Sequence, residues 1–263
     1  MLKFVQASFF KIDIVGEKVF KHFNWLDSIP REPRLTNITM RMLQTGAIYI
    51  FGRDKFYRPC IVMDAEAMAR LMKEDPNAIT GETFADLWVF LYMYIKNVML
   101  LPGHIDNWVN IVNFGKLGIT ALPRKPILAF AGVCQANMMY FLAKSYYVNV
   151  SWGQMTLYKT LSSFINEETR AKICLTGDNT HAELATLFHP CQLERRFGGT
   201  IDTPTNFWPP YVGPEFVPLG QEDAREMVSE EDYPQCIAEN PELLVHPEYA
   251  ISPNHPQRDF EFA

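Results

Sequence analysis

The chain has 263 residues, and its 30 acidic side chains outnumber the 24 basic ones, giving a formal net charge of −6. Hydrophobic residues make up 48% and charged residues 21% of the sequence, which is ordinary for a soluble protein. A chain of this length buries enough surface to need no disulfide or structural metal, so we expect one domain, or one domain followed by a tail.

The first part of the chain contains two short runs of β-type residues followed by helical segments. The runs at 47–51 and 59–63 flank the turn-forming residues 52–55, a pattern that predicts a β-hairpin. A helix is predicted over 65–73 and ends before Pro76. A longer helix follows, with Thr83 as its expected cap, and ends after Leu100 at a Pro-Gly pair.

The second part alternates between predicted strands and predicted helices. Strands are expected at 108–114, 146–150 and 172–175, and helices at 127–144, 154–164 and 167–171. Alternation of this kind is typical of βαβ crossovers and predicts an α/β fold with a mixed, mostly parallel sheet. The apolar windows 84–101 and 127–143 are interrupted by polar residues, so we interpret them as buried helices rather than membrane spans.

Charge and proline are concentrated at the C-terminal end. Residues 201–263 contain 13 acidic and two basic side chains, together with ten of the 18 prolines. Such spacing of proline prevents long helices and central strands. We therefore expect an extended acidic tail over 213–263, which is either a solvated appendage or an arm that binds a basic surface of this chain or of a partner.

The motifs of common enzymes and metal sites are absent from the sequence. It lacks His-Glu-x-x-His, Gly-x-Ser-x-Gly and a Walker loop, and no two histidines stand at helical i, i+3 or i+4 spacing. We expect no catalytic residues, no metal site and no cofactor other than a bound lipid. Scattered basic residues and a pI near 5.6 argue against nucleic acid as a partner.

Cysteine usage and the first residues of the chain indicate a compartment. Five widely spaced cysteines without a Cys-x-x-Cys pair argue against a secreted disulfide scaffold and a zinc ribbon. Lys3, Lys11 and Asp13 interrupt the apolar core that a signal peptide needs. We expect a cytoplasmic or other reducing compartment, with peripheral membrane association, and not secretion.

Four strings, in order, carry a resemblance to a known family. The most specific is Phe164-Ile165-Asn166-Glu167-Glu168-Thr169-Arg170-Ala171-Lys172-Ile173, and the last is 192–200, which ends in Phe-Gly-Gly-Thr. The other two are 4–25 and the hairpin region 52–62. Together they resemble the CRAL-TRIO family of retinaldehyde-binding, tocopherol-transfer and phosphatidylinositol-transfer proteins. The resemblance implies a remnant of an N-terminal helical region over 1–40 and a lipid-binding domain over 41–212.

The resemblance implies an apolar pocket closed by a movable gate helix at 154–164. The apolar stripe on this helix is explained either by ordinary core packing or by a ligand chain. The expected pocket and gate residues are Met138, Tyr147, Asn149, Met155, Tyr158, Leu161 and Phe164.

Members of the family that bind phosphatidylinositol have a lysine where this chain has Ala182. The resemblance leaves His181, Arg195 and Arg196 as substitute headgroup residues. The predicted function is non-enzymatic binding, and transfer between membranes, of a phospholipid or another lipophilic molecule. The alternative is a degenerate CRAL-TRIO fold that serves as a docking subunit, with residues 213–263 wrapping a protein partner.

Overall fold

The computed structural model describes residues 4–5, 11–28, 35–56, 58–75, 79–100, 105–117, 132–134, 137–138, 141–162, 165, 167–177 and 180–208. The predicted tail at 213–263 lies outside these residues, so the predicted domain boundaries stay predictions.

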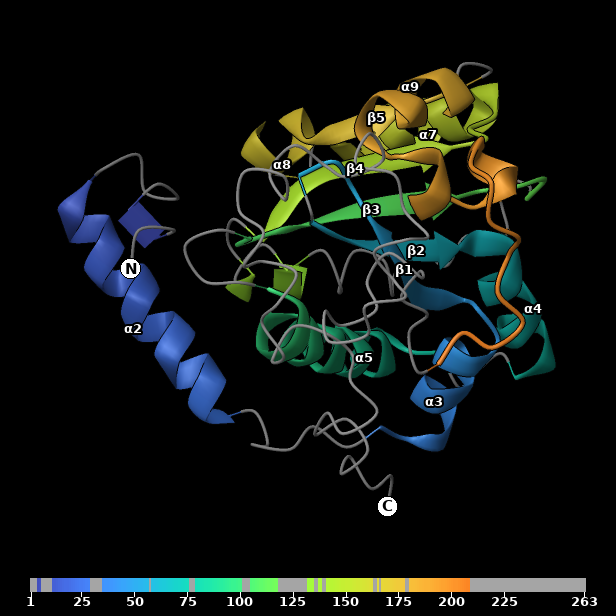
Figure 1. The fold of residues 1–263 in the computed structure, drawn as a ribbon. Helices are drawn as coiled ribbons and strands as arrows, with labels where there is room; N and C mark the ends of the chain where they lie inside the picture. Colours follow the sequence, from blue (N-terminus) through green and yellow to red (C-terminus); the bar gives the residue numbers. More distant parts are fainter. Residues whose placement is uncertain are drawn as a thin grey trace, which may run out of the picture.

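A five-stranded sheet forms the centre of the molecule (Figure 1). Its order is β1-β2-β3-β4-β5; β1 pairs antiparallel with β2, and all other neighbours are parallel. This confirms the predicted mixed, mostly parallel α/β sheet. The strands are β1 Ile48–Arg53, β2 Pro59–Asp64, β3 Trp108–Asn113, β4 Leu142–Val148 and β5 Ile173–Leu175.

The predicted hairpin between β1 and β2 is present and is closed by a buried carboxylate. Asp54 Oδ1 accepts hydrogen bonds from the backbone N–H groups of Phe56 and Arg58, and the Arg58 guanidinium pairs with Oδ2 at 2.6 Å. Gly52 has a φ of +67°, and a Cβ there would lie 2.1 Å from the backbone oxygen of Gln192. Only glycine therefore fits where the closing segment crosses β1.

One face of the sheet is covered by α3 (Asn37–Gln44), α5 (Gly81–Tyr94) and the π-helix η1 (Ile95–Met99). In Figure 1, α5 lies below the strands. The predicted cap of the long helix was wrong by three residues: Thr80 is the cap, and Thr83 completes the capping box. The core on this face includes Met42, Leu43, Ile48, Ile61, Leu87, Trp88, Leu91 and Trp108.

The opposite face is covered by α9 (Thr180–Leu187) and by the 3₁₀ turns η4 (Pro190–Gln192) and η5 (Arg195–Phe197). Figure 1 shows α9 above the strands. The second core joins alternate residues of the strands to this cover and includes Tyr49, Val62, Val109, Ile111, Tyr146, Val148, Leu184, Phe188 and Phe197. The sheet therefore has two buried faces, as expected for parallel strands.

The remaining helices are α2 (Ile12–Ser28), α4 (Ala65–Glu74), α7 (Trp152–Leu161) and α8 (Glu167–Ala171). Helix α4 begins at Asp64, whose side chain accepts from the Ala67 N–H at 3.0 Å. Helix α2 packs through Trp25, whose ring centroid lies 5.8 Å from that of Tyr92 in α5.

The predicted helix over 127–144 is wrong at its C-terminal end. Residues 132–134 and 137 are helical, but β4 begins at Leu142, where parallel pairing with β3 supplies the backbone hydrogen bonds. The predicted strand at 146–150 accordingly begins earlier and stops at Val148. Asn149 follows in the left-handed region, with φ +56°, and ends the strand.

Candidate functional site

Helix α7 occupies the place of the predicted gate helix, although it begins two residues earlier than predicted. Ser151 caps it, and Gln154 returns the hydrogen bond to the backbone of the cap in a capping box. The Gln154 amide also donates to the backbone oxygen of Leu117 at 2.8 Å. This bond ties the first turn of α7 to the segment that follows β3.

The aromatic residues predicted for the pocket lie together. The ring of Tyr147 in β4 stacks on Phe114 at 5.8 Å and lies 6.3 Å from the ring of Tyr158 in α7. Because Tyr146 points toward α9, strand alternation places Tyr147 on the opposite face of the sheet. The site therefore lies between this face and α7.

The other predicted pocket residues are more scattered. Met138 is buried in the core between the sheet and α5, and its sulfur atom lies 3.8 Å from the sulfur atom of Cys134. Met155 is half-buried on α7, and Asn149 is exposed at the end of β4. Leu161 ends α7, and Phe164 lies outside the described residues.

The packing of α7 differs from that of α9. Leu184 and Leu187 of α9 are buried in the core. Among the described side chains of α7, only Gln154 is buried, and the apolar Met155 and Tyr158 are half-buried. The described contacts of α7 are therefore those of its capped first turn, and the described part of its apolar side, Met155 and Tyr158, is half-buried.

Two phenol groups give the site hydrogen-bonding capacity without charge. Burial raises the pKa of Tyr147 to about 12. The nearby Tyr158 also raises this pKa, whereas Ser145 lowers it. Burial also raises the pKa of Tyr158. Both groups stay neutral at physiological pH and can donate or accept a hydrogen bond.

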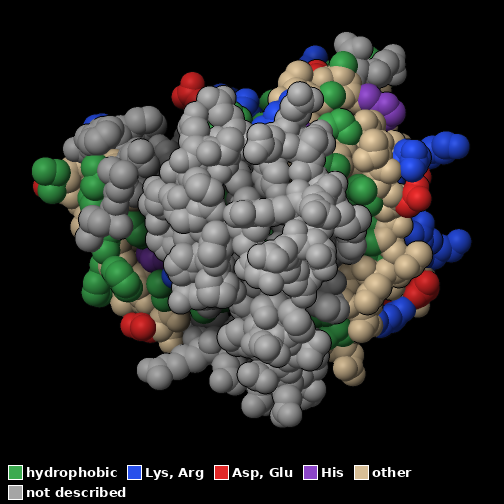
Figure 2. All heavy atoms as spheres, in the orientation of Figure 1, with side chains coloured by type: hydrophobic (Ala, Val, Ile, Leu, Met, Phe, Trp, Pro, Cys, Tyr) green, Lys and Arg blue, Asp and Glu red, His purple; other side chains and the backbone are tan. Residues whose placement is uncertain are grey.

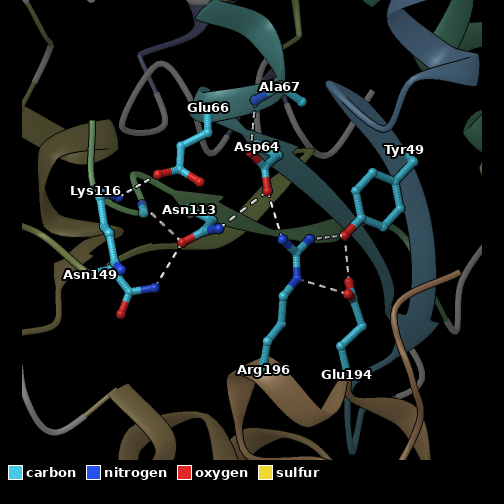
Figure 3. Close-up of polar contacts among 10 residues, drawn as sticks. Tyr49, Asp64, Glu66, Ala67, Asn113, Lys116, Asn149, Glu194 and Arg196 are labelled. Carbon is cyan, nitrogen blue, oxygen red and sulfur yellow. Dashed lines mark hydrogen bonds and ion pairs between the residues drawn. The ribbon is translucent and has the colours of Figure 1, made fainter. Parts of the chain in front are cut away.

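A chain of polar side chains connects the closing segment of the domain to the strand ends (Figure 3). Arg196 donates to Asp64 Oδ2 at 2.6 Å and to Glu194 Oε2 at 2.8 Å, and it also donates to the Tyr49 hydroxyl. The same hydroxyl donates to Glu194. Burial lowers the pKa of Arg196, but Tyr49, Glu194 and Asp64 together raise it above its ordinary value, so the guanidinium stays charged.

The chain continues from Asp64 to the start of α7. Asn113 donates to Asp64 Oδ2 at 3.2 Å and accepts from the Asn149 amide at 2.8 Å. Asn149 stands two residues before Ser151, the cap of α7. Figure 3 shows that these side chains converge from the ends of β2, β3 and β4. The polar chain thus joins the closing segment to the residue from which α7 departs.

Residues 43–199, more than half of the sequence, match the CRAL/TRIO domain. The chain belongs to the CRAL/TRIO family. The crystal structure of Sfh5 is similar to it with a TM-score of 0.62 and 13% sequence identity, covering 80% of this chain and 73% of that one. At this identity the likeness shows a common fold. Membership in the CRAL/TRIO family confirms the predicted resemblance and a general lipid-binding character.

The three headgroup candidates that the CRAL/TRIO resemblance suggested lie on the α9 side of the sheet. His181 is exposed, with Nε2 3.3 Å from the backbone oxygen of Arg196. Arg195 is also exposed and pairs with Asp202 at 3.0 Å. The Arg196 guanidinium is occupied by its three partners. The structure does not bring these residues together with Tyr147 and Tyr158.

Several residues of the site were missed by the sequence analysis. Asn110 and Ser145 are polar residues within the apolar strands β3 and β4, and this interruption is the signal that the sequence offers. Asp64 and Tyr49, two of the three partners of Arg196, are 132 and 147 residues from it in sequence and leave no local pattern. Among the described residues, no group of His, Cys, Asp or Glu is arranged to hold a metal ion, and no helix is long and apolar enough to cross a membrane.

Proposed function

We propose that this CRAL/TRIO protein binds a phospholipid or another lipophilic molecule, without catalysing a reaction on it, between α7 and the Tyr147 face of the sheet. The observation that carries this proposal is the half-burial of Met155 and Tyr158, the described residues of the apolar side of α7. An apolar helix face of this kind gains stability from covering a hydrocarbon chain, at about 0.8 kcal/mol for each buried CH₂ group. Transfer between membranes follows when α7 moves and releases that chain.

The exposed side of α7 supports release at a membrane. Trp152, the first residue of the helix, is 82% exposed. Tryptophan favours the boundary between lipid headgroups and water because its ring is apolar and its N–H is polar. Lys159 lies seven residues further along and is also exposed. This side of α7 thus combines an interfacial ring with a cation that suits anionic lipid.

A charge placed on either side of α7 tests the proposal. We expect Tyr158→Asp to reduce by at least tenfold the lipid taken from vesicles of phosphatidylcholine, phosphatidylethanolamine, phosphatidylinositol and diacylglycerol, measured by mass spectrometry of the re-isolated protein. Thr156→Asp places the same charge on the exposed side of α7; it should leave the amount of lipid held at equilibrium unchanged, even where it slows uptake. Equal uptake by both variants and the parent protein would contradict the proposed site.

The second candidate function is that of a docking subunit. It is favoured by an exposed apolar stripe on α2, where Ile12, Phe20 and Phe23 are 81%, 67% and 55% exposed. Figure 2 shows hydrophobic side chains on this outer edge of the molecule. Large exposed aromatic residues on one helix face are typical of interaction surfaces.

Deletion of residues 213–263 separates the two candidate functions. A lipid carrier should take up the same lipids from the mixed vesicles after the deletion. A docking subunit whose tail wraps a partner should lose its native complex, measured as the mass of the assembly by light scattering. If the complex keeps its mass without the tail, docking through these residues is wrong.

A further inference from the structure

Asn110 is a polar residue in the middle of the central strand β3. Its neighbours Val109 and Ile111 point into the core beneath α9, so Asn110 points to the opposite face, the face that carries Tyr147. The side chain is 9% exposed, and its carbonyl oxygen Oδ1 is fully buried. This oxygen has no hydrogen-bond partner within the part of the chain that the structure describes.

The surroundings of Asn110 connect it to the proposed lipid site. Asn110 pairs in register with Ser145 on β4, and neighbouring strands lie about 4.8 Å apart. Ser145 is buried two residues before Tyr147 on the same face of β4, and the ring of Tyr147 lies 6.3 Å from that of Tyr158 in α7. A ligand that extends from α7 across Tyr147 and Ser145 would therefore reach Asn110.

A second asparagine in the same strand, by contrast, has both of its side-chain polar atoms paired. The amide nitrogen of Asn113, three residues later, donates a hydrogen bond to Asp64. Its carbonyl oxygen accepts hydrogen bonds from the Asn149 amide and from the backbone N–H of Gly115. Buried carbonyl groups are almost always paired, because burial without a donor costs the hydration of the oxygen. Leucine at position 110 would fill a similar volume without that cost. The buried oxygen of Asn110 is therefore open to a donor that the described part of the chain does not supply.

We propose that Asn110 Oδ1 accepts a hydrogen bond from a hydroxyl or N–H group in the buried part of the ligand. This inference rests on the proposed function and narrows the ligand class. The ligand is an amphiphile that presents a donor near the middle of the sheet. A lipid with only ester, ether or hydrocarbon groups in its buried part leaves the oxygen unpaired and is disfavoured. Sites built around such a group discriminate strongly against analogues that lack the donor.

The test uses two lipids that differ in one donor. The full chain is incubated with phosphatidylcholine vesicles that contain equal amounts of 1,2-dioleoylglycerol and its 3-O-methyl ether, and the lipids in the re-isolated protein are quantified. We expect the alcohol to exceed the ether by at least tenfold. Asn110→Leu should carry the two in nearly equal amounts, because it removes the oxygen that distinguishes them. Val112→Leu, on the same face of β3, should retain the preference.

The outcomes separate this inference from the proposed function. If the parent protein takes up the alcohol and the ether equally, the role of Asn110 is wrong and lipid binding stands. The same conclusion follows if it takes up only phosphatidylcholine. Uptake of no lipid of any class would overturn both.

Unfolding of the lipid-free protein supplies an independent readout. If Asn110 is a recognition residue, Asn110→Leu should raise the melting temperature, whereas a lower temperature would indicate a structural role.

Discussion

Arg196 Nη1 lies 2.6 Å from Asp64 Oδ2, although 132 residues separate the two in sequence. Asp64 is both the last residue of β2 and the cap of α4, and Arg196 belongs to the turn η5 that closes the domain. Through Asn113 and Asn149 the same carboxylate is linked to the start of α7. One ion pair thus connects the closing segment, the sheet and the proposed gate helix.

Replacement of Arg196 by methionine should lower the free energy of unfolding by about 3–5 kcal/mol, because it leaves the buried Glu194 carboxylate without its cation. Urea denaturation measures this difference. The neighbouring Arg195 is a matched control: its pair with Asp202 is exposed, so Arg195→Met should change stability by less than about 1 kcal/mol. Equal effects of the two variants would contradict the assigned importance of the network.

The conformation of Asn149 predicts a clear order of substitutions. With φ at +56°, a β-branched residue is strained there, so Asn149→Val should destabilise the protein by about 1–2 kcal/mol. Asn149→Gly keeps the backbone conformation at low cost and loses only the bond to Asn113. Thermal unfolding should therefore rank glycine above valine. The reverse order would show that Asn149 is not held in this conformation.

His22 predicts a dependence of stability on pH. Burial of its ring, followed by the nearby charge of Lys96, lowers the pKa of His22 below 6.5, while a backbone hydrogen bond with Asn137 opposes the shift. The unfolded chain therefore binds a proton at a higher pH than the folded one. The contribution of His22 to stability is complete above about pH 6.5 and is lost as the pH falls toward the folded-state value.

Substitution of His22 checks this sign. His22→Phe removes the titrating group and should flatten the fall in unfolding free energy below pH 6.5, measured by urea denaturation at several pH values. Lys96→Met removes the charge that repels the proton and should reduce the slope in part. If the free energy of unfolding of His22→Phe falls with pH as steeply as that of the parent protein, groups other than His22 cause the pH dependence.

Trp152→Ala should separate membrane action from folding. Because the ring is exposed, its loss should change the free energy of unfolding by less than about 0.5 kcal/mol. If α7 releases lipid at the membrane surface, transfer between donor and acceptor vesicles should slow several-fold, while the amount of lipid held at equilibrium stays the same. An unchanged transfer rate would exclude Trp152 from the membrane contact.

The fold was predictable because its signals are local. Short runs of β-type residues marked β1 and β2, an alternating run marked β3, and the short helix α8 at Glu167–Ala171 was predicted with correct bounds. The prediction failed at Leu142–Lys144, where residues that suit a helix join β4 because pairing with β3 decides their conformation. The π-helix at Ile95–Met99 also left no local pattern.

Residues of the site could be predicted only where helical spacing or the resemblance to the CRAL-TRIO family indicated them. Tyr147 and Tyr158 come together as expected, whereas Arg196 reaches partners that are 132 and 147 residues away. Asn110 was not predicted, because a single asparagine in a strand has no meaning until its face and its missing partner are known. Long-range pairing and burial, which only the folded chain defines, decide these roles.

Native mass spectrometry of the purified full chain, with organic extraction of whatever is bound, tests the central claim most directly. The account predicts one lipid or similar amphiphile for each protein molecule, carrying a hydroxyl or N–H donor, and its loss in the Tyr158→Asp variant. A bare protein mass that stays unchanged after incubation with mixed vesicles would contradict lipid binding between α7 and the sheet.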